Sequence, residues 1–159
     1  MTADAGEILL VEDNPRDVEL TLYALKKHKL ATRIEVVGDG VEAMDYIFST
    51  GRFSTRGGPG ALKMVLLDLK LPRVDGIEVL RRIKSDPRTK SIPVVVLTSS
   101  KEEPDIEESY RLGANSYVVK PVDFDAFAHT VQRIGIYWLQ LNQRASADFQ
   151  DGASVGHDG

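Results

Sequence analysis

Carboxylates, a hydroxyl and an amine stand at the ends of four separate apolar runs in this chain of 159 residues. Glu12 and Asp13 follow the first run, Asp68 the third, Thr98 the fourth and Lys120 the fifth. In an open sheet of parallel strands such positions share one edge, so we expect these side chains to meet there. A carboxylate can attack phosphorus and form an acyl phosphate, which makes Asp68 a candidate phosphoacceptor.

A divalent cation is expected among the carboxylates, because three of them close together raise one another's pKa. Their oxygens suit Mg²⁺, which takes one or two carboxylates together with phosphate oxygens. Lys120 would neutralise phosphoryl oxygens on the side opposite the metal. Thr98 would donate a hydrogen bond to the phosphoryl group, and the small Ser99 would leave room for the donor.

Each of these residues also has a simpler explanation on its own. Glu12 and Asp13 would complement the dipole of a following helix, Asp68 could form a turn, Thr98 could cap a helix, and Lys120 could lie in an exposed loop. Their coincidence at four strand ends favours one shared site.

Five apolar runs alternate with helical patterns, which predicts an α/β fold. The predicted strands are residues 8–11, 34–37, 64–67, 92–97 and 116–119, and the predicted helices begin at Pro15 and near residues 41, 76, 104 and 123. Short, continuously apolar strands are typical of a parallel sheet that is covered on both faces. We therefore expect a doubly wound five-stranded parallel sheet with flanking helices.

One domain is expected to account for most of the chain. It spans residues 6–144, between an N-terminal tail at 1–5 and a small, polar, disordered tail at 145–159. The glycine-rich stretch 49–61 is predicted to be a flexible insertion, because it lacks the Gly-Lys-Ser/Thr ending of a phosphate-binding loop.

The last predicted helix, residues 123–143, carries more apolar residues than one face requires. Those expected to face the sheet are Phe124, Phe127, Val131, Ile134, Trp138 and Leu141. Ile136, Tyr137 and Leu139 are left over, and exposed apolar clusters of this kind favour a partner surface. We predict a homodimer through them; the alternative is that the last turns fold back onto the domain.

Composition narrows the classes of function. The formal net charge is −4 and no long basic run is present, which argues against nucleic-acid binding. There is no cysteine, and the predicted places of His28, His129 and His157 are solvent-facing and remote from the strand ends, which argues against zinc. No segment resembles a signal peptide or a membrane span, so the expected location is cytoplasmic.

The motifs together resemble those of the bacterial two-component response-regulator receiver family, which has a flavodoxin-type sheet. The carrying segments are residues 9–14, 66–72, 75–76, 96–99 and 113–121, within a resemblance over about residues 6–143. The resemblance implies that a sensor histidine kinase phosphorylates Asp68, and that Mg²⁺ is held by Glu12, Asp13, Asp68 and the Lys70 backbone carbonyl. It also implies that Thr98 and Lys120 bind the phosphoryl oxygens and that Thr98 and Tyr117 form a switch.

Such a protein would be a single-domain regulator that signals by protein–protein contact and turns over no separate substrate. Two features are similar to the small regulators that serve cyanobacterial and bacterial phytochrome kinases: the opening Glu12-Asp13-Asn14-Pro15, and the insertion from Phe53 to Gly60. That similarity implies a phytochrome kinase as phosphoryl donor and light as the input.

Other classes fit less well. A phosphohydrolase of the haloacid-dehalogenase type would carry an acid two residues after the nucleophile, where this chain has Lys70. A flavin carrier would need a hydroxyl-rich loop where Glu12 and Asp13 stand, and a pseudo-receiver would lack the complete set of site residues. A transcription factor would need a longer, more basic segment after Gln143.

Overall fold

Five parallel strands form one sheet in the order β2-β1-β3-β4-β5. The computed structural model describes residues 7–30, 33–58 and 62–143. The strands are β1 (Glu7–Val11), β2 (Arg33–Val37), β3 (Leu62–Leu67), β4 (Val94–Thr98) and β5 (Ser116–Val119). All residues of β1 and β4 are buried, as expected for strands covered on both faces.

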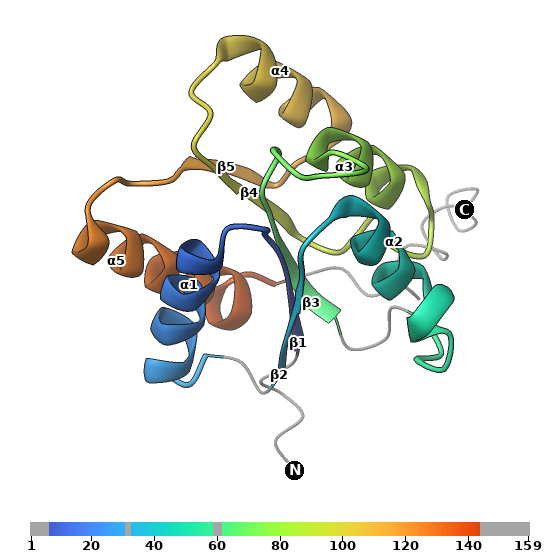
Figure 1. Cartoon of the computed structure of the whole chain (residues 1–159), viewed down its shortest axis with the longest axis horizontal. Helices are drawn as coiled ribbons and strands as arrows, with labels where there is room; N and C mark the ends of the chain where they lie inside the picture. Colours follow the sequence, from blue (N-terminus) through green and yellow to red (C-terminus); the bar gives the residue numbers. More distant parts are fainter. Residues whose placement is uncertain (1–6, 31–32, 59–61, 144–159) are drawn as a thin grey trace, which may run out of the picture.

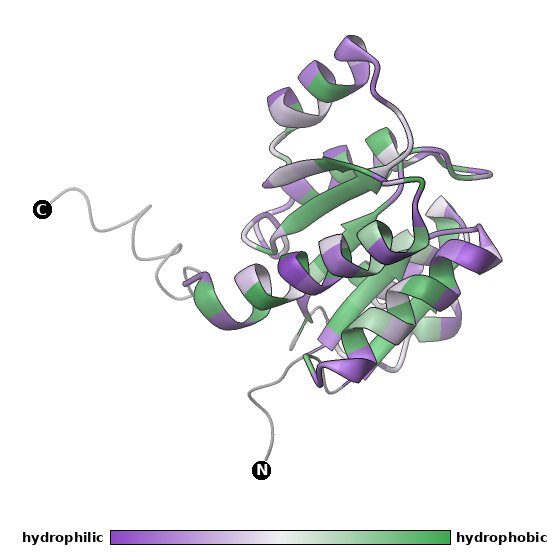
Figure 2. Cartoon of the chain, turned by 90° about the vertical axis from the view of Figure 1, so that its left-hand side faces the viewer, coloured by the Kyte–Doolittle hydropathy of each residue, from purple (hydrophilic) through white to green (hydrophobic). Residues whose placement is uncertain are grey.

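Helices cover both faces of the sheet (Figure 1). On one face lie α1 (Pro15–Lys27) and α5 (Phe124–Gly135); on the other lie α2 (Gly40–Phe48), α3 (Gly76–Ser85) and α4 (Glu103–Leu112). Alternate residues of the strands contribute to two separate apolar clusters. The α1–α5 cluster lies between the sheet and helices α1 and α5, and the other lies between the sheet and the opposite layer of helices. Figure 2 shows the apolar strands between helices whose outer sides are polar. The predicted doubly wound fold is confirmed.

Side-chain caps fix where four helices begin. Asn14, Asp39, Asp75 and Asp123 each accept hydrogen bonds from backbone N–H groups of the first turn of α1, α2, α3 and α5. Each capping residue lies in the segment after a strand (β1, β2, β3 or β5). These four helices therefore begin near the carboxyl edge of the sheet, where the site is predicted. The cap at Asp123 agrees with the predicted start of the last helix near residue 123.

The predicted last helix is interrupted. After α5 the chain continues as η3 (Ile136–Leu141), a π-helical segment, in which Asn142 N donates to Tyr137 O at 2.7 Å. A π-helix closes i→i+5 hydrogen bonds, so its side chains no longer follow the 3.6-residue period.

This change of period moves the apolar side chains to other faces. Leu141, predicted to face the sheet, is 63% exposed, so that prediction was wrong. The prediction for Phe124 was also wrong, for a separate reason: it is the first residue of α5, before the change of period, and is 51% exposed. Ile136 and Leu139, predicted to be surplus, are partly buried against the α1–α5 cluster. Only Tyr137 of the three predicted dimer residues is largely exposed, at 48%.

The loop after α2 is packed rather than detached over its described residues. A short 3₁₀ turn, η2 (Gly51–Phe53), sets Phe53 edge-on against Tyr46, with ring centroids 4.9 Å apart. Gly58 N donates to Ser49 Oγ at 2.7 Å. The predicted tails at 1–5 and 145–159, and the loop's residues 59–61, lie outside the described residues. Within the described part of the chain, no helix combines the length and apolarity needed to cross a bilayer.

Candidate functional site

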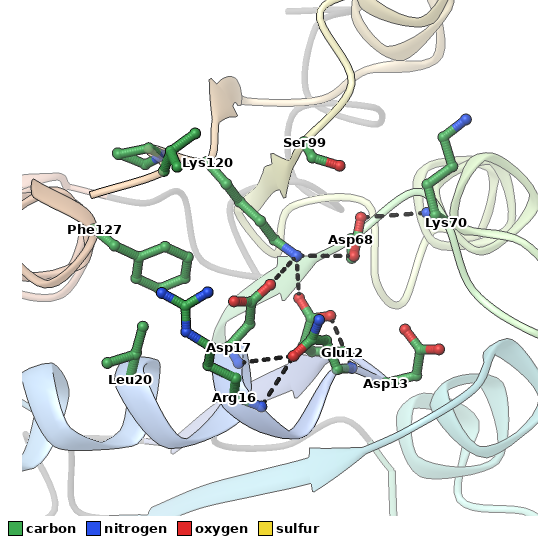
Figure 3. Close-up of a pocket in the computed structure, with 13 residues that line it drawn as sticks. Glu12, Asp13, Arg16, Asp17, Leu20, Asp68, Lys70, Ser99, Lys120 and Phe127 are labelled. Atoms are coloured by element: carbon green, nitrogen blue, oxygen red, sulfur yellow. Dashed lines mark hydrogen bonds and ion pairs between the residues drawn. The ribbon is translucent and has the colours of Figure 1, made fainter. Parts of the chain in front are cut away.

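Three elements bring Asp68, Glu12 and Lys120 together at the carboxyl edge of the sheet. Asp68 follows β3, Glu12 follows β1 and Lys120 follows β5. The Lys120 Nζ lies 2.8 Å from Glu12 Oε1 and 3.1 Å from Asp68 Oδ2 (Figure 3). All three side chains are less than 10% exposed. The structure therefore places these predicted residues in contact.

Asp13 completes a group of three carboxylates. Ligand oxygens of Glu12, Asp13 and Asp68 lie within 4.8 Å of one another, with Asp13 exposed and the other two buried. They line a cavity of about 410 Å³. Clustered hard oxygens at the mouth of a polar cavity are the donor set that Mg²⁺ prefers.

The charges at the cavity oppose one another strongly. Burial raises the pKa of Glu12 to about 7, and the charge of Asp68 adds to this, while Lys120 acts in the other direction. Burial would lower the pKa of Lys120, but its hydrogen bonds to Asp17 and Glu12 outweigh that effect and hold the pKa above its usual value. A carboxylate whose charge is disfavoured by burial and by a like neighbour fits a place that a cation would occupy.

Lys70 contacts Asp68 through its backbone. Its N–H donates to Asp68 Oδ1 at 3.2 Å, and its exposed side chain extends away from that carboxylate (Figure 3). Gly76 at the start of α3 packs against the Asp68 carbonyl so closely that a Cβ there would collide with it. The backbone on both sides of Asp68 is thus held by direct contacts.

Thr98 and Ser99 occupy different depths at the end of β4. Thr98 is fully buried, and its Oγ1 accepts from Ser100 N at 3.5 Å. Ser99 is exposed and lines the cavity. In this state the Thr98 hydroxyl belongs to the β4–α4 loop rather than to the cavity wall.

Tyr117 of β5 contacts the same loop. Its hydroxyl donates to Ser100 O at 3.0 Å, and Ser100 Oγ donates to Asp105 Oδ2 at 2.6 Å. One loop residue is therefore bonded to Thr98, Tyr117 and α4.

The histidines lie elsewhere. His28 and His129 are exposed and line a hollow between α1 and α5, not the cavity at Asp68; His157 lies outside the described residues.

Sequence reasoning missed Asp17. Its Oδ2 lies 2.8 Å from Lys120 Nζ, closer than Asp68 does. Leu20 and Phe127, also unpredicted at the site, form an apolar side of the cavity (Figure 3). An acid in the first turn of a helix is explained by the helix dipole, so the sequence offered no signal that Asp17 reaches a residue 103 positions away.

A family model described as response regulator receiver domain matches residues 8–132. The chain belongs to this family, whose receiver domains take a phosphoryl group from a histidine kinase. Its role in phosphorelay signalling follows from that membership and from its relatives.

Two relatives are similar over most of both chains. "Probable methanogenesis regulatory protein FilR2" of Methanothrix harundinacea (strain 6Ac) is 44% identical over 86% of this chain and 85% of its own. "Response regulator Rcp1" of Synechocystis sp. (strain ATCC 27184 / PCC 6803 / Kazusa) is 39% identical over 84% of this chain and 88% of its own.

Three solved structures carry the same fold. The phosphorylated cyanobacterial phytochrome response regulator RcpA has a TM-score of 0.82 at 40% identity, over 89% of this chain and 99% of its own. The Mn²⁺-bound form of response regulator Rcp1 has a TM-score of 0.81 at 37% identity, also over 89% and 99%. The bacteriophytochrome response regulator AtBRR is 54% identical over 87% of this chain and 98% of its own, with a TM-score of 0.68.

Proposed function

We propose that Asp68 is the residue that accepts the phosphoryl group. The observation that carries the proposal is the single buried contact set in which Asp68 touches Lys120 at 3.1 Å and shares an oxygen cluster with Glu12 and Asp13. An Asp68 carboxylate oxygen attacks phosphorus, the P–N bond of the kinase phosphohistidine breaks, and its electron pair returns to the imidazole nitrogen. Lys120 stabilises the charge on the phosphoryl oxygens.

The proposed metal ligands are Glu12, Asp13, Asp68 and the Lys70 backbone carbonyl. A Mg²⁺ ion bound there would neutralise phosphoryl oxygens and allow two buried carboxylates to remain ionised. The donor set of this chain and the Mn²⁺-bound form of Rcp1 support a divalent cation. The chain then catalyses its own phosphorylation and turns over no separate substrate.

The proposed output is a change in the β4–α4 loop. Thr98 is buried and its Oγ1 accepts from Ser100 N at 3.5 Å, so a movement of Thr98 toward a phosphoryl oxygen would change that contact with the loop. Tyr117 is bonded to the same residue, so a shift of the loop changes what Tyr117 contacts. Phosphorylation then acts as a local electrostatic event on a surface with two arrangements.

The proposed donor is a phytochrome histidine kinase. The names of RcpA and AtBRR, which are 40% and 54% identical to this chain, support that input. A bacteriophytochrome kinase labelled on its histidine should transfer its phosphoryl group to this chain at least tenfold faster than an unrelated labelled kinase does. Equal rates from both kinases would remove the phytochrome assignment and leave the receiver chemistry intact.

Intact mass after incubation with acetyl phosphate tests the site itself. We expect a gain of one phosphoryl group in the presence of Mg²⁺, no gain in chelator, and no gain in Asp68→Asn. A mass gain that persists in Asp68→Asn would move the phosphoacceptor to another residue. No gain in the unaltered chain would make the site inactive.

We also propose a homodimer that uses the exposed apolar side chains of η3. Tyr137 and Leu141 are four residues apart and are 48% and 63% exposed. This surface replaces the predicted trio, of which Ile136 and Leu139 are partly buried against the core.

A further inference from the structure

Four carboxylates surround the cavity, and one of them has no part in the oxygen cluster. Glu12, Asp13 and Asp68 form the cluster. Asp17 also lines the cavity, and its carboxylate is paired with Lys120, whose Nζ lies 2.8 Å from Asp17 Oδ2. Asp17 is 16% exposed and Lys120 is 9% exposed, so this ion pair is well shielded from water.

The three carboxylates around Lys120 would make different contacts during phosphoryl transfer. Glu12 and Asp68 would also face the metal, and Asp68 would carry the phosphoryl group. When those two carboxylates turn to the cation and the new group, Asp17 is the remaining contact that can hold the ammonium in place. We propose that Asp17 is a positioning residue for phosphoryl transfer, which fixes the Lys120 ammonium beside Asp68; the proposal rests on the function proposed above.

The backbone around Asp17 is held without its carboxylate. The Asn14 side chain caps α1 by accepting from Arg16 N and Asp17 N, at 2.9 and 3.2 Å. Thr21 Oγ1 donates to Asp17 O at 2.7 Å. None of these bonds uses the Asp17 carboxylate, so all three should survive its substitution and α1 should begin at the same residue in Asp17 variants.

Asp17 and Lys120 come from neighbouring elements, and their side chains meet between them. α1 and α5 lie side by side on one face of the sheet (Figure 1), and Lys120 enters from the loop between β5 and α5. The Asp17 carboxylate points across this gap to the Lys120 amine (Figure 3). A lysine side chain is a flexible stem of four carbons, so its amine can occupy many positions. The contact with the Asp17 carboxylate limits those positions.

Two variants with the same charge separate the contact from the charge. Asp17→Asn keeps an acceptor oxygen at the same reach, whereas Asp17→Ala has none. We expect Asp17→Ala to slow phosphorylation by acetyl phosphate at saturating Mg²⁺ about tenfold, the effect of losing one charge-assisted hydrogen bond. Asp17→Asn should recover at least half of that loss on a logarithmic scale. Glu19→Ala, which removes an exposed charge from the same helix, should react within about twofold of the unaltered chain.

A second readout distinguishes positioning from a structural role. Asp17 lies outside the oxygen cluster, so the Mg²⁺ affinities of the Asn and Ala variants, measured by calorimetry, should agree within about threefold. In ¹⁵N spectra the Lys120 ammonium signal should shift or broaden in Asp17→Ala and less in Asp17→Asn. A parallel loss of Mg²⁺ affinity in Asp17→Ala alone would mean that α1 has moved, and would overturn the proposal.

The rates give the other contrary outcomes. Equal or faster phosphorylation of Asp17→Ala, with the unaltered chain active, would show that Asp17 does not assist Lys120. Absence of phosphorylation in the unaltered chain would instead contradict the proposed function, and the two failures are therefore distinct.

Discussion

At the residue scale, Lys120 both balances buried negative charge and is proposed to bind the phosphoryl group. Its ammonium touches Glu12, Asp17 and Asp68 within 3.1 Å. It therefore balances buried negative charge before any phosphoryl group arrives. Charge in the cavity is balanced either by Lys120 alone or by Lys120 together with a divalent cation. Stability and chemistry are coupled through this one side chain.

Replacing Lys120 tests that coupling. Lys120→Met leaves three carboxylates without their cation, and removing one partner of buried ion pairs costs about 3 kcal/mol. We expect a loss of that size in the free energy of unfolding in chelator, measured by urea denaturation, and a smaller loss in Mg²⁺ because the metal replaces the missing charge. Phosphorylation in Mg²⁺ should also be slowed, because Lys120 no longer stabilises the phosphoryl oxygens.

Lys70→Met is the matched control. Lys70 also lines the cavity, but its side chain is exposed and points away from Asp68. Its replacement should change the free energy of unfolding by less than about 0.5 kcal/mol. An Lys120→Met protein as stable as the Lys70 variant in chelator would refute the view that Lys120 balances the cavity.

The sequence predicted Glu12, Asp13, Asp68 and Lys120 because strand ends in a parallel sheet converge by topology alone. It did not predict Asp17, because its contact depends on how α1 and the β5–α5 loop face one another. That relation comes from packing between elements remote in sequence, and no local pattern encodes it.

At the scale of elements, close approach between α3 and β3 fixes the backbone at Asp68, the proposed phosphoacceptor. Gly76 N donates to Leu69 O at 3.0 Å, and a Cβ on Gly76 would collide with the Asp68 carbonyl and the Leu69 Cα. The first turn of α3 can therefore lie directly behind Asp68 only if residue 76 has no side chain.

Gly76→Ala should displace α3 from Asp68. The added methyl group meets backbone atoms that cannot yield, so we expect a loss of about 2 kcal/mol in the free energy of unfolding, together with slower phosphorylation. Gly38→Ala is the control: a Cβ there meets no atom within 4 Å, and its effect should stay within about 0.5 kcal/mol. Equal stability of the two variants would show that the contact behind Asp68 is not tight.

The end of the last helix shows where element prediction fails. A 3.6-residue period placed Leu141 on the sheet face, but the π-helical η3 leaves it 63% exposed. Trp138 packs against the α1–α5 cluster as predicted, and Leu139, predicted to be surplus, packs there too. The sequence from Ile136 to Leu141 is compatible with an ordinary helix, so no local pattern predicts the π turn.

At the scale of the whole molecule, the two layers of helices hold different contacts of the site. α1 and α5 flank the Asp17–Lys120 contact, while α4 and β5 hold the Ser100 contacts to Tyr117 and Asp105. Both layers meet the carboxyl edge of the sheet at Asp68. We therefore expect a change in charge at this edge to act on both layers, and η3, the proposed dimer surface, continues the first of them.

Removing the apolar side chains of η3 should dissociate the proposed dimer. In a symmetric pair, Tyr137→Ser with Leu141→Ser removes four half-exposed side chains, roughly 1 kcal/mol each, or about a thousandfold in Kd. Sedimentation equilibrium should show a dimer for the unaltered chain and a monomer for this double variant at the same concentration. Tyr110→Ser on α4 removes an aromatic side chain of similar exposure, 50%, and should remain dimeric. If the unaltered chain is a monomer at every concentration, with and without a phosphoryl mimic, η3 is not a dimer surface and the proposed homodimer is wrong.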